Sequence, residues 1–118
     1  MRVSTIRIPC RDLSLSEDFY SSKLGLKKIF GSVQKGFIGY QLDNAQIIIE
    51  PEEKGEFECG RFLGFSLETT NISSFYSSKI EAGVTFIGEP KKQNWGGIMT
   101  HILDCNGNSF SVIENHEK

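Results

Sequence analysis

The sequence lacks an excess of positive charge, and it lacks any long apolar run. Its 13 Lys and Arg residues face 15 Asp and Glu residues, which gives a net charge of −2 without a basic stripe for nucleic acid. No apolar run approaches the roughly 20 residues of a membrane span. The first six residues show no apolar segment typical of a signal peptide. We therefore expect neither a nucleic-acid partner nor a membrane partner.

Cysteine is scarce, and its three residues lie far apart in the sequence. Cys10, Cys59 and Cys105 form no CxxC pair, which argues against a redox motif, a zinc knuckle and a disulfide-rich secreted fold. No cysteine lies beside a predicted histidine or a helix N-terminus that would activate it. Glycine-rich nucleotide-binding motifs are absent as well. These observations favour a cytoplasmic protein and give no support to nucleophilic catalysis.

What the sequence does contain is an internal repeat. Phe19-Tyr20-Ser21-Ser22-Lys23 recurs letter for letter as Phe75-Tyr76-Ser77-Ser78-Lys79. Each copy precedes an apolar residue and a glycine, and each lies upstream of a Leu-Asp and then an Ile-Glu pair. We therefore expect residues 1–118 to form one domain built from two modules, about 1–57 and about 58–118, because two copies are too few for a solenoid.

The hydrophobic period changes in the same order within each module. Alternating residues predict a first strand at 5–10 and at 62–68, and helical spacing follows at 14–24 and 72–82. Ser14 and Glu17 have the spacing of a capping box. Three short strands then follow in each module, at 27–30, 36–42 and 45–50, and at 84–87, 97–103 and 109–113. The sequence predicts an α+β fold of two βαβββ modules, whose curved mixed sheets form a cup-shaped cavity.

With these elements placed, the sequence resembles the vicinal oxygen chelate superfamily, which includes glyoxalase I, bleomycin-resistance proteins and extradiol dioxygenases. The first module contributes Asp12-Leu13, Phe19-Tyr20 and Leu24-Gly25-Leu26 to this similarity, and the second contributes Glu81-Ala82-Gly83-Val84 and Glu89-Pro90. The most specific part is Trp95-Gly96-Gly97 followed by Asp104-Cys105-Asn106-Gly107-Asn108. The resemblance covers essentially the whole chain.

In catalytic members of that family, a divalent metal is held by one side chain from the first strand and one from the last strand of each module. Carried over by position, these places hold Thr5, Ile47, Phe62 and Ser111. Hydroxyls are weak neutral ligands, and Ile and Phe are not ligands, so we expect no metal and no cofactor. If the alignment slips, Gln46 and Glu50 remain candidates from that strand, but a shift by one residue would turn every side chain to the other face and disrupt the apolar alternation.

Three further residues are candidates to line the cup. Arg7 shares a strand face with Thr5 and is suited to clamping an anionic group. The alternative is that it lies at the sheet edge or pairs with a nearby glutamate. Trp95, beside two glycines, is suited to stacking on a planar ligand or to plugging the junction of the two modules. His101 is a candidate general base, or else a structural or exposed strand residue without an acidic partner.

The leading hypothesis is a homodimeric protein that binds a small planar or amphipathic molecule without metal and without catalysis, as the resemblance to bleomycin-resistance proteins implies. The predicted lining residues are Thr5, Arg7, Ile47, Phe62, Trp95, His101 and Ser111. The alternative is a metal-dependent lyase or dioxygenase with an atypical ligand set. A third possibility is a structural or regulatory protein whose cup is filled by Phe62 and Ile47. The modules pair either within one chain or across a two-fold dimer.

Overall fold

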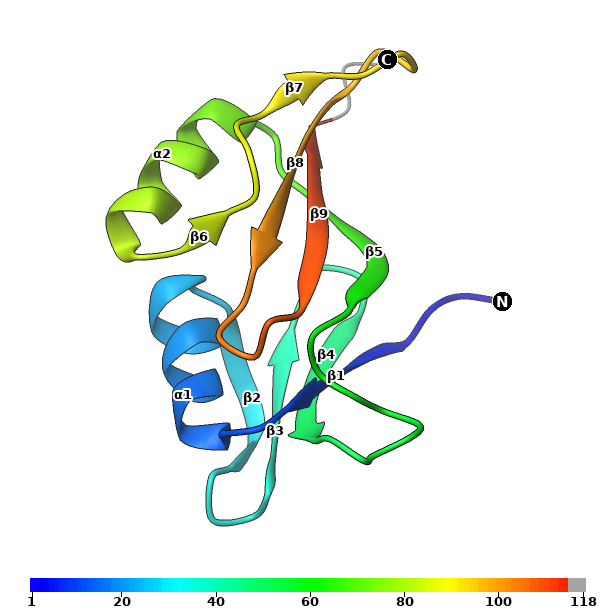
Figure 1. The fold of residues 1–118 in the computed structure, drawn as a ribbon, viewed down its shortest axis with the longest axis vertical. Coiled ribbons are helices and arrows are strands. Elements are labelled where there is room, and N and C mark those ends of the chain that lie inside the picture. Colours follow the sequence, from blue (N-terminus) through cyan, green and yellow to red (C-terminus); the bar gives the residue numbers. More distant parts are fainter. Residues whose placement is uncertain (115–118) are drawn as a thin grey trace.

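A computed structural model describes residues 1–114 and contains two curved β-sheets, with the helices on one side (Figure 1). The first sheet has the order β1-β4-β3-β2, with β1 (Thr5–Cys10), β2 (Lys27–Ser32), β3 (Phe37–Gln41) and β4 (Gln46–Pro51). The second has the order β5-β9-β8-β6, with β5 (Phe62–Glu68), β6 (Thr85–Phe86), β8 (Ile98–Leu103) and β9 (Ser109–Glu114). A short strand, β7 (Lys91–Lys92), pairs with β8 and was not expected from the sequence.

The two modules repeat one topology. In each, the first strand runs parallel to the last one, and the remaining neighbours are antiparallel. The helical segment follows the first strand as α1 (Leu13–Glu17) and the π-helix η1 (Asp18–Lys23) in one module, and as α2 (Ile72–Ala82) in the other. The predicted α+β fold of two βαβββ modules is thereby confirmed.

Both helical segments begin at a capping side chain in the same place. The carboxylate of Asp12 accepts a hydrogen bond of 3.0 Å from the backbone N–H of Leu15, and the amide oxygen of Asn71 accepts one of 3.0 Å from Ser74. The capping box predicted at Ser14 was therefore wrong by two residues. Asp12 satisfies the free N–H groups earlier, so Ser14 already lies inside the first turn.

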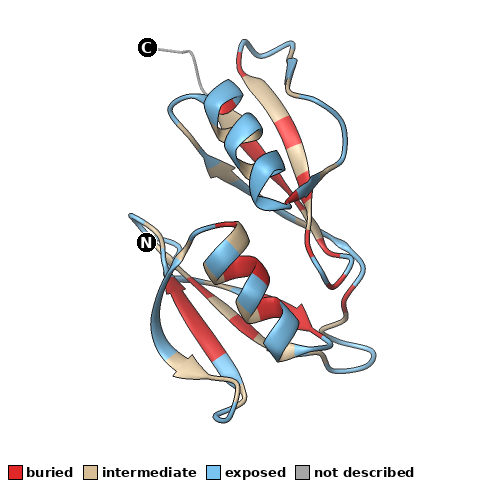
Figure 2. Ribbon diagram, turned by 90° about the vertical axis from the view of Figure 1, so that its left-hand side faces the viewer, coloured by how far each residue is buried: buried red, intermediate tan, exposed pale blue. Residues whose placement is uncertain are grey.

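Each sheet buries one face beneath its helical segment. Tyr40 and Ile8 of the first sheet are fully buried, and the ring centroid of Tyr40 lies 6.1 Å from that of Tyr20 in η1. In the second sheet, Phe110 is fully buried and stacks on Phe65 with centroids 4.9 Å apart. Figure 2 shows these buried stretches lying behind the helices. Burial of this apolar surface is the main force that holds each helix on its sheet.

Where the helices of the two modules meet, a lysine from each helical segment lies against the C-terminal end of the other. Lys79 of α2 places its Nζ 3.2 Å from the position that a Cβ would take at Gly25, where the first helical segment ends. Reciprocally, Lys23 of η1 places its Cε 3.5 Å from the corresponding position at Gly83, the C-cap of α2. These lysines are the last residues of the two identical pentapeptides, so the repeat makes a contact with approximate two-fold symmetry.

A buried polar cluster also joins the modules, and Asp104 lies at its centre. Its carboxylate accepts hydrogen bonds from the Tyr20 hydroxyl at 2.6 Å, from the backbone N–H groups of Asn106 and Asn108 at 2.8 and 2.9 Å, and from Asn108 Nδ2 at 3.1 Å. Burial of Tyr20 and the adjacent Asp104 carboxylate raise the pKa of Tyr20 well above its ordinary value.

The two asparagines extend this cluster into the first module. Asn108 Nδ2 donates to the carbonyl oxygen of Pro9 at 3.0 Å, and Asn106 Nδ2 donates to Ser16 Oγ at 3.0 Å. The backbone N–H of Arg11 donates in turn to Asn106 Oδ1 at 3.0 Å. The turn at 104–108, which resembled a family signature in the sequence, is therefore the joint that fixes one module against the other.

Because both helical segments lie on one side of the molecule, both sheets turn their other faces the opposite way (Figures 1 and 2). We call these the first and second open faces. Within residues 1–114 no strand of one sheet pairs with a strand of the other, so the two open faces lie side by side and remain separate. Among the described residues, no helix is long and apolar enough to cross a membrane.

Candidate functional site

The first open face is defined by strand register. Thr5 pairs with Gln46, Arg7 with Ile48 and Pro9 with Glu50, so these six side chains lie on one face of the sheet. Gly39 and Gln41 of β3 continue the same rows. The residues between them, such as Ile8 and Ile49, lie on the buried face. The predicted residues Thr5 and Arg7 therefore share the first open face.

Arg7 is held by an acidic partner and an aromatic ring. Its Nε donates to Glu50 Oε1 at 2.8 Å, and its Nη2 lies 2.7 Å from the same oxygen. Its guanidinium carbon lies 4.5 Å from the centroid of the Phe57 ring, in cation–π contact. The interpretation in which Arg7 pairs with a glutamate is confirmed. Phe57 belongs to the segment between the modules, and the sequence offered no periodic signal for its position.

An aromatic ring covers the middle of the first open face. Phe30 pairs with Gly39, and a side chain at Gly39 would collide with the Phe30 ring. The ring can therefore lie flat across the sheet only because Gly39 has no Cβ. Phe37 lies beside it, with ring centroids 6.1 Å apart, and both aromatic residues are more than a third exposed. Phe30 was not among the predicted lining residues.

The second open face brings three predicted residues together. His101 pairs with Ser111 across β8 and β9, and Ser111 Oγ shares a hydrogen bond of 3.1 Å with His101 Nδ1. The ring of Phe62 meets the imidazole edge-on, with centroids 6.0 Å apart. The register between β5 and β9 shifts between Phe62 and Ser66, and this bulge accompanies the approach of Phe62 to His101.

Trp95 lies in the turn between β7 and β8. Gly97 follows the same alternation as Met99 and His101, and a side chain on it would collide with the indole of Trp95. The indole therefore lies over the second open face, at the Gly97 end of the strand. Trp95 is 52% exposed and packs on its own turn. The alternative in which it plugs the junction of the two modules was wrong.

Ile47 requires a correction. It pairs with Ile6 and Tyr40, is fully buried beneath the helices and belongs to the core, so it cannot line an open face. The neighbouring Gln46, Ile48 and Glu50 occupy the open side of β4 instead. Three consecutive isoleucines, Ile47 to Ile49, place apolar side chains on both faces of this strand. Apolar periodicity therefore could not identify which face is the open one.

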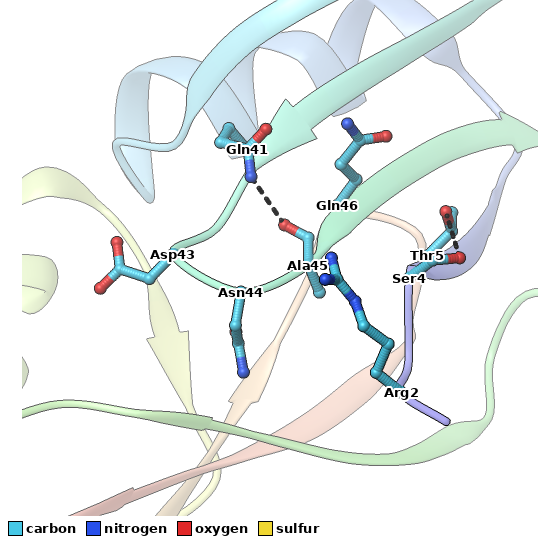
Figure 3. Close-up of a pocket in the computed structure, with 8 residues that line it drawn as sticks. All are labelled: Arg2, Ser4, Thr5, Gln41, Asp43, Asn44, Ala45 and Gln46. Atoms are coloured by element: carbon cyan, nitrogen blue, oxygen red, sulfur yellow. Dashed lines mark hydrogen bonds between the residues drawn. The ribbon is translucent and has the colours of Figure 1, made fainter.

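Thr5 lies at the margin of the first open face, beside a shallow polar pocket of about 230 Å³ (Figure 3). The pocket lies where the turn between β3 and β4 meets the chain before β1, and Gln41 Nε2 donates to the carbonyl oxygen of Ala45 at 3.2 Å there. A second shallow pocket of about 450 Å³ lies beside the first helical segment, between Ser14 and Lys28. Both are rich in polar side chains, unlike the aromatic open faces.

The cysteines lie away from these features, and their environments keep them protonated. Burial and the nearby Glu52 carboxylate raise the pKa of Cys59 to about 12. Burial also raises the pKa of Cys10 and of Cys105. Because the thiolate is the nucleophilic form, these shifts suppress thiol chemistry at all three positions.

The four positions implied by the resemblance do not supply the ligands of a divalent metal. They hold the hydroxyls of Thr5 and Ser111 and the apolar side chains of Ile47 and Phe62, and Ile47 lies in the core. Gln46 and Glu50 do share the first open face with Thr5, and Glu50 is paired with Arg7. Within residues 1–114, no cluster of three or more His, Cys, Asp or Glu side chains is arranged to hold a metal ion. What the open faces offer is aromatic surface with a few polar contacts.

Comparison with known proteins agrees with this architecture. Residues 2–112 match the family model described as Glyoxalase/Bleomycin resistance protein/Dioxygenase superfamily. A search of curated proteins found no match.

Several solved structures share the fold along nearly the whole chain. A member of the same superfamily from Sphaerobacter thermophilus is 27% identical, with a TM-score of 0.85 and 98% of each chain covered. An antibiotic-binding protein from Streptomyces sp. CB03234 is 20% identical, with a TM-score of 0.81 over 98% of this chain and 96% of that one. A lactoylglutathione lyase from Agrobacterium tumefaciens is 14% identical, with a TM-score of 0.76 over 96% of this chain and 92% of that one.

Proposed function

Because the chain belongs to the glyoxalase/bleomycin resistance protein/dioxygenase superfamily, we propose that it binds a small planar or amphipathic molecule without a metal ion and without catalysing a reaction. The observation that carries this proposal is the pair of open faces. Phe30 and Phe37 on one, and Phe62 and Trp95 on the other, present large aromatic side chains to solvent. Exposed aromatic surface of this kind is typical of sites that stack on a planar ligand.

The structural neighbours support the same function. One protein of this fold, with 20% identity, is an antibiotic-binding protein. A hydrolytic or lyase mechanism would require a polarising metal or an activated nucleophile. The hydroxyls of Thr5 and Ser111 and the apolar side chain of Phe62 suit neither role, whereas they are compatible with contact to an organic ligand.

The proposal includes a homodimer as the ligand-binding unit. Each chain turns two aromatic faces to solvent, and neither face closes on the other within the chain. A second copy, related by a two-fold axis, would place its second open face over the first open face of its partner and form two equivalent cups. Free Cys10, Cys59 and Cys105 are consistent with work in the reducing cytoplasm, and nucleic acid and membranes have no part in this function.

A thermal-shift screen tests this function. We expect at least one compound from a set of planar antibiotics and aromatic acids to raise the melting temperature, because a ligand that binds the folded state stabilises it. Trp95→Ala should weaken that ligand about tenfold or more through loss of stacking. Arg7→Ala should weaken an anionic ligand to a similar extent, and Leu15→Ala, on the exposed surface of α1, serves as the control.

Two results would contradict the proposal. Unchanged affinity in both Arg7→Ala and Trp95→Ala would show that the ligand binds elsewhere. Stoichiometric nickel, zinc, manganese or iron in protein purified without chelator, together with activity on a hemithioacetal or a catechol, would instead establish a metal-dependent enzyme.

A further inference from the structure

His101 occupies the centre of the second open face. Its row across the sheet contains Ser66, Ser111 and His101 itself, because Ser66 pairs with Ser111 and Ser111 pairs with His101. The next row runs from Glu68 through Ile113 and Met99 to Lys91, and the other adjacent row runs from Phe62 through Ser109 and Leu103 to Thr85. The nearest neighbours of the imidazole are therefore apolar side chains and serine hydroxyls, with the charged Glu68 and Lys91 at the two ends of the next row, in the middle of the surface that is proposed to meet a ligand.

One ring nitrogen of His101 is occupied, and the other reaches solvent. Nδ1 shares its hydrogen bond with Ser111 Oγ, and Ser111 is only 3% exposed. In residues 1–114, Ser111 is the hydrogen-bond partner of the imidazole, and no buried side-chain nitrogen or oxygen there lacks a partner. Nε2 is therefore accessible on the open face, and the ring centroid of Phe62 lies 6.0 Å from that of the imidazole.

Arg7, the other candidate anchor, is already engaged. Its Nε and Nη2 both lie within hydrogen-bond distance of Glu50 Oε1, and its guanidinium stacks on Phe57. A ligand group at Arg7 would have to compete with Glu50. A group that approaches His101 Nε2 would displace only solvent.

The chemistry of the Ser111–His101 pair selects a class of ligand group. A serine hydroxyl both donates and accepts, so it suits either tautomer of the imidazole. If Ser111 donates to Nδ1, then Nε2 carries the proton and donates outward. If Nδ1 donates to Ser111, then Nε2 accepts. A hydroxyl on the ligand complements both states, whereas a carboxylate complements only the first.

We propose that His101, positioned by Ser111, anchors a hydroxyl group carried on an aromatic ring of the ligand. This inference rests on the proposed function and narrows its ligand to hydroxylated planar aromatics. The ring of such a ligand lies along the apolar strip formed by Phe62, Met99 and Trp95. Its hydroxyl forms a hydrogen bond with His101 Nε2, while Nδ1 of the same ring is hydrogen-bonded to Ser111 Oγ.

The matched probes 2-naphthol and 2-methylnaphthalene test the inference, because they differ mainly in a hydroxyl against a methyl group. Equilibrium dialysis with the intact protein should show about tenfold tighter binding of 2-naphthol, the effect of one hydrogen bond made in an apolar site. In the double variant His101→Phe with Ser111→Ala, this preference should fall to about twofold or less. Its affinity for 2-methylnaphthalene should change by less than about threefold, since an aromatic ring remains beside Phe62.

Two further variants make the result specific. Met99→Ala should weaken both probes to the same degree, because it removes only apolar contact from the same face. His101→Gln should retain part of the preference, because its amide can donate and accept. If both probes bind but the double variant keeps its tenfold preference, the assignment of His101 is wrong and the proposed function stands. If neither probe binds the wild-type protein, the inference is overturned, and the thermal-shift screen decides the proposed function separately.

Discussion

The buried carboxylate of Asp104 is the residue on which the joint between the modules depends. It is 5% exposed, and it accepts from one hydroxyl, two backbone N–H groups and one side-chain amide. A buried carboxylate is tolerated only when its oxygens are satisfied in this way. The Tyr20 donor comes from the other module, so this one hydrogen bond links folding within each module to the contact between them.

Removal of that hydrogen bond should change both the stability and its dependence on pH. Tyr20→Phe should lower the free energy of unfolding at neutral pH by about 1–3 kcal/mol, because Asp104 loses a buried donor. The raised pKa of Tyr20 favours the folded state below the unfolded tyrosine pKa of about 10. Above that pH the unfolded state ionises first, so wild-type stability should fall, and it should fall less steeply in Tyr20→Phe.

Urea unfolding at neutral pH and at several values above pH 10 measures both effects. Tyr76→Phe is the control, since Tyr76 lies in α2 outside the Asp104 cluster and contacts the Phe86 ring. Equal losses of stability in the two variants would show that the Tyr20 hydroxyl has no special role in the joint. Identical slopes above pH 10 in wild type and Tyr20→Phe would contradict the pH argument.

Single residues also show where prediction from sequence reaches its limit. Alternation placed Arg7 on the open side of its strand, because its neighbours Ile6 and Ile8 are apolar. The positions carried over from the family resemblance likewise placed Thr5, Phe62 and Ser111 on open sides. That positional reasoning failed at Ile47, where apolar residues occupy both faces of one strand. The packing of Phe57 on Arg7 was also beyond prediction, since it depends on how the segment between the modules folds back.

At the level of elements, the repeated pentapeptide is explained by the contact between helices. Lys23 and Lys79 occupy equivalent positions, and each lies against the glycine that ends the helical segment of the other module. The C-terminus of a helix carries partial negative charge on its free carbonyl groups. A lysine is therefore favoured there, and the approximate symmetry of the two modules creates the same contact twice.

Removal of either lysine contact should lower the free energy of unfolding by the same amount, and the two losses should add. Lys23→Met and Lys79→Met should each lower the free energy of unfolding by about 0.5 kcal/mol, and the double variant by about 1 kcal/mol, because the interaction with a helix terminus is modest. Lys54→Met, in the segment between the modules, is the matched control. Urea unfolding at low ionic strength gives the values, and added salt should reduce the differences. A loss in Lys54→Met as large as in either helix variant would contradict this account.

The elements that could be predicted are those with a long, regular pattern. The βαβββ order and the helix of the second module follow from hydrophobic period and glycine position. Strand β7 consists of two lysines and has no apolar alternation, so only its pairing with β8 reveals it. The π-helical turn at Asp18–Lys23 was likewise hidden, because helical spacing does not distinguish it from an α-helix.

At the scale of the whole molecule, the helices and the open faces lie on opposite sides of a flattened body measuring 42 × 37 × 28 Å. Two exposed apolar residues mark these sides. Phe62 on the second open face is 60% exposed, and Leu15 on α1 is 58% exposed. Their exposure is nearly equal, so their contribution to the stability of a single chain should be similar. They differ in whether the proposed dimer covers them.

This difference gives a direct test of the assembly. Phe62→Asp should convert the proposed homodimer to a folded monomer, because it would place a charge in an apolar contact between copies. Leu15→Asp should leave the dimer intact, since Leu15 lies on the helical side. Sedimentation velocity at several protein concentrations measures the two states, and circular dichroism verifies that both variants fold. A wild-type protein that remains monomeric at every concentration, or a dimer dissociated by Leu15→Asp and not by Phe62→Asp, would show that the open faces do not pair.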